Sequence, residues 1–160
     1  MKKKIPEMLN VLTIITIGWS FMMLVSSIVN ALVFSGNIDT VRGEIANADI
    51  EGQKGEPFLR ILIDVADTVL EHAELLNYNS IIVYLLSISA ALFMRKLLKT
   101  GFWIYVLATA LEISVPLIVL DNKLAAAAVI FGSVFSIVFI ILYGVNYKHL
   151  IGTKEPQIKE

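Results

Sequence analysis

A single acid stands inside a long apolar run. Glu112 interrupts "ATALEISVPLIVL" (108–120), and Pro116 follows four residues later. A carboxyl group among apolar side chains can bind a proton or a cation, or it can act as a protonated hydrogen-bonding clamp. Pro116 lacks the N–H that would bond the carbonyl of Glu112, so we expect a kink at this level. Tyr105 and Thr109 share the helical face of Glu112. The candidate intramembrane polar site is therefore Glu112, Thr109, Tyr105 and Pro116.

The composition places this acid in a membrane protein. Of the 160 residues, 57% are hydrophobic and 17% are charged, whereas soluble domains average about 45–50% apolar and about 25% charged residues. A membrane-spanning helix needs roughly 17–25 residues, and we predict four, at 11–34, 76–98, 102–120 and 124–144. The fold class that follows is an all-α integral membrane protein, a four-transmembrane-helix bundle that forms one domain.

The first apolar segment has a second interpretation, because Lys2, Lys3 and Lys4 precede it as in a signal peptide. The apolar core of a signal peptide runs only about 7–15 residues before a cleavage site with small residues. Here the run continues to bulky Leu32 and Phe34. We therefore interpret the segment as an uncleaved anchor.

The position of Glu112 in its span puts it near the bilayer centre. It lies ten residues after Phe102, which corresponds to a depth of about 15 Å. The other spans offer only hydroxyl groups at that depth: Ser20, Tyr84, Ser87, Ser133 and Ser136. Three alternatives follow for the carboxyl group: a protonated clamp on one of these hydroxyls, a proton- or cation-binding site in a transport cycle, or a pairing with another subunit.

The charges predict an orientation, since Lys and Arg concentrate on the cytoplasmic side of membrane proteins. Basic residues gather in the N-terminus, in the 95–99 connection and in the tail 145–160, whereas acids gather in 35–79. We expect both termini to be cytoplasmic, and 35–79 and the 121–123 turn to be outside. The chain has no cysteine, which favours a bacterial protein of the inner membrane.

The outer segment 35–79 divides into two parts. The polar, glycine-containing stretch 37–57 predicts a loop. After Pro57, a 3-4 spacing of apolar residues predicts an amphipathic helix that could be continuous with the second span. Its apolar seam consists of Leu59, Leu62, Ala66, Val69, Ala73 and Leu76. The seam could pack on its own chain, lie on the lipid surface or dock a partner.

Small residues at helical spacing predict where spans approach closely, because membrane helices associate through small side chains. In the last span these are Ala128, Gly132 and Ser136. Ser87 and Ala91 in the second span, and Ser26 and Asn30 in the first, have the same spacing. The pattern does not say whether these faces contact their own chain or another protein.

The sequence contains none of the usual catalytic signatures: no glycine-rich phosphate loop, no HExxH and no GxSxG. We expect no catalytic residues, no metal, no cofactor and no nucleic-acid partner. The predicted function is that of a non-enzymatic accessory or structural subunit of a larger membrane protein complex. It would contact lipid and dock through its transmembrane faces and the outer amphipathic helix. The alternative is a small proton- or cation-coupled transporter or channel that works as an oligomer around Glu112.

Overall fold

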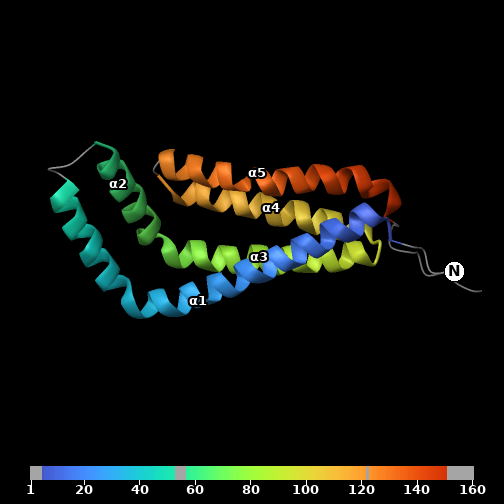
Figure 1. Cartoon of the computed structure of the whole chain (residues 1–160), viewed down its shortest axis with the longest axis horizontal. Helices are drawn as coiled ribbons and strands as arrows, with labels where there is room; N and C mark the ends of the chain where they lie inside the picture. Colours follow the sequence, from blue (N-terminus) through green and yellow to red (C-terminus); the bar gives the residue numbers. More distant parts are fainter. Residues whose placement is uncertain (1–4, 53–56, 122, 151–160) are drawn as a thin grey trace, which may run out of the picture.

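The computed structural model describes the backbone of residues 5–52, 57–121 and 123–150. It also describes the side chains of these residues, except those of 33–39, 41–42, 44–46, 48–52, 57–62, 125–126 and 129–130. Within these ranges the chain forms five α-helices and a final 3-10 turn (Figure 1). These are α1 (Glu7–Gly52), α2 (Pro57–Glu71), α3 (Ala73–Arg95), α4 (Lys99–Val119), α5 (Lys123–Asn146) and η1 (Tyr147–His149).

In the described part of the chain, four helical segments are long and apolar enough to cross a membrane. They are Glu7–Leu32, Ala73–Arg95, Lys99–Val119 and Phe131–His149. Helices are the natural form for such segments, because lipid offers no partner for a free backbone N–H or C=O. Large apolar side chains, such as Phe131 and Ile118, cover their outer surface. The predicted helical bundle of a multi-pass membrane protein is confirmed at this level.

The four spans lie side by side in an incomplete ring. α1 packs mainly on α3, α3 on α4, and α4 on α5, whereas α1 and α5 contact each other little. The bundle has a terminal end, where α1 begins and α5 finishes, and an α2 end opposite (Figure 1). α4 and α5 are antiparallel neighbours joined by a short connection.

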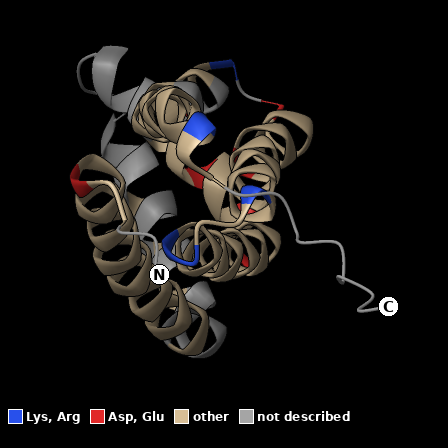
Figure 2. Ribbon diagram, turned by 90° about the vertical axis from the view of Figure 1, so that its right-hand side faces the viewer, with Lys and Arg blue, Asp and Glu red and all other residues tan. Residues whose placement is uncertain are grey.

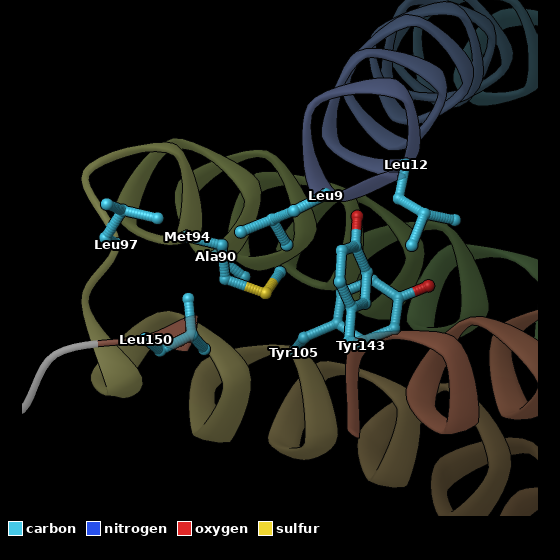
Figure 3. Close-up of a cluster of buried hydrophobic side chains, with 8 residues drawn as sticks. All are labelled: Leu9, Leu12, Ala90, Met94, Leu97, Tyr105, Tyr143 and Leu150. Carbon is cyan, nitrogen blue, oxygen red and sulfur yellow. The ribbon is translucent and has the colours of Figure 1, made fainter. Parts of the chain in front are cut away.

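The terminal end is closed by a compact core, which contains side chains from all four spans (Figure 3). Its members are Leu9, Leu12, Ala90, Met94, Leu97, Tyr105, Tyr143 and Leu150. Leu97 adopts a left-handed conformation (φ 61°) between α3 and α4, and burial of its side chain in this core accounts for a leucine there. The bundle is therefore fixed at one end.

Gly101 permits the close approach of α3 and α4 at this end. A Cβ atom at this position would lie 2.7 Å from the carbonyl oxygen of Ala90 and 2.7 Å from the backbone nitrogen of Met94. Since both neighbours are backbone atoms, a side chain could fit only if the helices moved apart.

The polar stretch after the first span differs from the prediction. We predicted a loop over 37–57, but α1 continues as a helix to Gly52, so the prediction is wrong for most of that length. Apart from Gly43, the residues of 40–51 are compatible with a helix, and their polarity was misleading. Beyond the apolar span, α1 bends and runs beside α2 (Figure 1). α2 does begin at Pro57 as expected.

α2 and α3 are separate helices, whereas the sequence left open a single continuous one. His72 lies between them with a non-helical ψ of 11°, and the chain turns sharply there (Figure 1). α2 contacts α1 most, then α5 and α3. Of the predicted seam, Leu59 and Leu62 lie outside the described side chains; Ala66, Ala73 and Leu76 are half-buried, and Val69 is exposed. Leu70, outside the predicted seam, is buried.

Candidate functional site

A cavity of about 820 Å³ lies inside the bundle, with Glu112 in its wall. All five α-helices contribute to its lining. The cavity exists because α1 and α5 diverge beyond the closed terminal end. Glu112 thus faces a space within its own chain.

Glu112 is linked to α5 through a hydroxyl group. Its carboxyl group has a side-chain hydrogen bond with Ser136. The hydroxyl of Tyr105 also has a hydrogen bond with Ser136. Tyr105 and Glu112 lie two turns apart on one face of α4, so Ser136 joins them into a short polar chain across the α4–α5 contact.

The α3 side of the site is polar as well. Tyr84 lies near enough to Glu112 for the two ionisable groups to influence each other electrostatically. Asn79 donates from Nδ2 to the backbone carbonyl of Leu111, at 3.4 Å. This bond ties α3 to α4 one residue before Glu112 and helps to fix the position of the carboxyl group.

The floor of the cavity faces the terminal end, where the lining residues Thr16 and Tyr105 both contact Tyr143, which lies outside the lining. The hydroxyls of Thr16 on α1 and Tyr143 on α5 share a hydrogen bond of 2.6 Å. The rings of Tyr105 and Tyr143 meet edge to face, with centroids 5.1 Å apart (Figure 3). These contacts join α1, α4 and α5 at the level where the cavity begins.

The side of the cavity between α1 and α5 is open. Trp19 on α1 and Phe135 on α5 both line it, yet 59% and 75% of their surfaces are exposed to the outside. Gly132 also lines this side, and a Cβ atom there would meet nothing within 4 Å. These residues lie in two of the candidate membrane spans, so in a bilayer the opening would face the hydrocarbon region.

The sequence-predicted polar site is brought together in part. Glu112, Tyr105 and Pro116 line the cavity. Thr109 is buried outside its lining and donates to the carbonyl of Tyr105, at 3.1 Å. α4 continues past Pro116 to Val119. The hydroxyl residues proposed at the depth of Glu112 all line the same cavity: Ser20, Tyr84, Ser87, Ser133 and Ser136.

The predicted packing residues have mixed positions. On α5, Ala128 and Gly132 are exposed and Ser136 is half-buried. Ser87 and Ala91 on α3 are buried, as expected for a contact face. On α1, Ser26 and Asn30 are exposed, so they form no buried contact within the described part of the chain, and a contact with another protein stays a prediction. The buried polar residues of α1 are instead Thr13, Thr16, Ser20 and Ser27.

Several site residues were missed by the sequence analysis, namely Thr16, Trp19, Asn79 and Tyr143. The spacing of the hydroxyl residues in α1 was the available signal, since 13, 16, 20 and 27 fall on one helical face. Asn79 and Tyr143 had no such pattern.

The charges of the described residues are unequally distributed. Among the described residues that line the cavity, Glu112 is the one with a charged side-chain type. Other charged groups lie mainly at helix ends, and most of the ribbon of the spans is uncharged (Figure 2). Acids of α2 lie near His72, but no cluster of three or more His, Cys, Asp or Glu suited to a metal occurs within the described ranges.

No family model matches this sequence, and no curated protein or solved structure is significantly similar to it.

Proposed function

We propose that this protein is a small, non-enzymatic membrane transporter that binds a proton or a cation at Glu112. The observation that carries the proposal is the position of this carboxyl group, inside a membrane-embedded cavity and hydrogen-bonded to Ser136. A transport site needs a group that can hold a positive charge within the low-dielectric part of the bilayer.

Charge balance supports this function. A bare carboxylate in an apolar site is unfavourable by several kcal/mol unless a positive charge accompanies it. The lining residues that the structure describes offer hydroxyl, amide and apolar groups beside Glu112, and no basic side chain. The positive charge would then come from a bound proton or a bound cation, which can exchange at the same carboxyl group.

The cavity favours the transporter over the accessory subunit, the two functions between which the sequence left a choice. An unmatched Glu112 was a reason to expect a partner subunit, but here the side chain faces its own bundle. α2, for which a partner was one of the open alternatives, packs beside α1 of its own chain. A transport site within a single chain also removes the need for an oligomer around Glu112.

Flux measurements in proteoliposomes test the proposal. Purified protein would be reconstituted with a pH-sensitive dye inside, and proton movement would be followed after a K⁺, Na⁺ or pH gradient is imposed. We expect Glu112→Gln to abolish the protein-dependent flux while its gel-filtration profile stays unchanged. The matched control is Glu74→Gln, since Glu74 is an exposed acid outside the cavity lining. Equal flux in wild type and Glu112→Gln would refute the proposal.

The second candidate is an accessory subunit of a larger membrane complex. The observation that favours it is the exposed small face of α5, where Ala128 and Gly132 are both exposed and a Cβ atom added at Gly132 would meet nothing within 4 Å. A partner helix could approach there. The test is extraction in mild detergent followed by mass spectrometry. A stoichiometric partner that Ala128→Leu releases would support this candidate, and a lone chain would count against it.

We propose an orientation of the protein in the membrane as well. Basic residues lie at the terminal end of the bundle: Arg95, Lys96, Lys99 and Lys148. Exposed acids Asp64, Asp67 and Glu71 lie on α2, at the other end. Under the positive-inside rule, the terminal end is cytoplasmic and α2 is external. A bacterial inner membrane remains the proposed location.

A further inference from the structure

We infer that the cavity takes an organic cation with a large apolar body, of the quaternary ammonium or phosphonium class. The inference rests on the proposed function and specifies the ligand of the same site. It follows from the combination of one carboxyl group, several aromatic rings and an opening toward lipid in a single cavity.

The size of the cavity points to a molecule larger than an inorganic ion. At about 820 Å³, it falls in the range of small-molecule sites. Hard inorganic cations prefer a shell of several oxygen ligands at close range. Here one carboxyl group stands in a space whose walls are mainly aliphatic and aromatic, so a bound organic group would fill volume that an inorganic ion would leave to water.

The aromatic lining suits a positive charge without a hydration shell. Among the described residues, five aromatic side chains line the cavity: Trp19, Tyr84, Tyr105, Phe135 and Phe139. They come from each of the four spans. Aromatic faces attract cations, and aromatic surroundings are the common solution for quaternary ammonium recognition. Glu112 would supply the opposite charge in the same space.

The open side of the cavity fits a ligand that reaches the site from the bilayer. Trp19 and Phe135 stand at the opening between α1 and α5 and are accessible from outside. An apolar cation partitions into the membrane and can enter there without crossing the closed terminal end. A lipid acyl chain could compete for this space, but it is neutral and would not be attracted by the charge of Glu112.

A pair of ions with the same shape and opposite charge tests the inference. Tetraphenylphosphonium and tetraphenylborate would be offered to the purified full-length protein, and binding would be measured by equilibrium dialysis. We expect tetraphenylphosphonium to bind and Glu112→Gln to weaken its binding by about tenfold or more. Tetraphenylborate should bind wild type more weakly than it binds Glu112→Gln.

Two glycine variants test the opening. Gly132→Phe adds a ring at the cavity wall, where an added Cβ atom meets open space, so we expect the protein to fold but to bind the phosphonium ion several-fold more weakly. Gly144→Phe is the matched control, because Gly144 is on the same helix with the same open surroundings but is outside the cavity lining. Weakening by both variants to the same extent would contradict the proposed entry.

The outcomes separate this inference from the transport proposal. Equal binding of both ions, unchanged in Glu112→Gln, would mean that the cavity accepts a lipid-like molecule, and the inference would be overturned. Proton or metal-ion flux that depends on Glu112, without binding of the phosphonium ion, would overturn the inference and leave the proposed function intact. Binding that depends on Glu112 supports the inference even if no flux is detected.

Discussion

Thr16 and Tyr143, 127 residues apart in the sequence, share a buried hydrogen bond of 2.6 Å between their hydroxyl groups. This bond connects α1 to α5, which contact each other less than any other two neighbouring spans of the bundle. It lies at the floor of the cavity, where Tyr143 also packs on the ring of Tyr105. The bond therefore holds together the closed end of a bundle whose other part is open.

Removal of this bond should weaken the bundle measurably. Tyr143→Phe leaves the Thr16 hydroxyl without its partner, so we expect the free energy of unfolding to fall by about 0.5–1.5 kcal/mol. Thr16→Val should have a similar effect, and the double variant should lose less than the sum of the two. Unfolding in sodium dodecyl sulfate, followed by circular dichroism, measures this. Tyr78→Phe is the control, since Tyr78 is exposed; strictly additive losses would argue against the bond.

The α3–α4 contact should not tolerate a side chain at Gly101. Gly101→Ala places a Cβ atom 2.7 Å from two backbone atoms, and we expect a loss of about 1–3 kcal/mol of stability. Gly144→Ala, which meets nothing within 4 Å, should be neutral or slightly stabilising. Thermal unfolding of both variants in detergent checks the difference. Equal melting temperatures would show that the helices are farther apart than described.

Ser136 should matter for transport through its contacts with Glu112 and Tyr105. Ser136→Ala removes the shared hydroxyl, and we expect the flux to fall by about tenfold, the effect of one lost hydrogen bond to an ionisable group. Ser89→Ala serves as the control, because Ser89 is exposed and bonds the carbonyl of Leu85 in its own helix. Full activity of Ser136→Ala would remove the polar chain from the mechanism.

Single cysteines can establish the orientation, since the natural chain contains none. We expect Lys148→Cys to react with an impermeant maleimide only after the cells are opened, and Lys123→Cys to react in intact cells. The physical reason is the concentration of basic residues at the terminal end. The reverse labelling pattern would invert the proposed topology.

The sequence predicted the features that depend on local pattern. The apolar runs predicted four spans, Pro57 predicted the start of α2, and the depth of Glu112 predicted the hydroxyl groups around it, Ser136 among them. Each of these follows from composition or helical geometry along one segment.

Features that depend on how helices meet were not predictable from the sequence. The cavity depends on the divergence of α1 from α5, which no single segment encodes. The same holds for the bond between Thr16 and Tyr143. The helical extension of α1 to Gly52 was missed because a polar helix beyond the membrane lacks the apolar periodicity that identifies a buried one.

The most direct measurement of the central claim is the modification of Glu112 by dicyclohexylcarbodiimide, an apolar reagent that attacks protonated carboxyl groups within membranes. Modified protein would be mapped by mass spectrometry, and flux would be measured on the same samples, with Glu112→Gln as the control. An accessible, proton-binding Glu112 in the cavity predicts that the adduct forms on this residue and that flux falls in proportion. Stoichiometric modification of Glu112 with undiminished flux, or modification confined to the exposed acids of α2, would contradict the account.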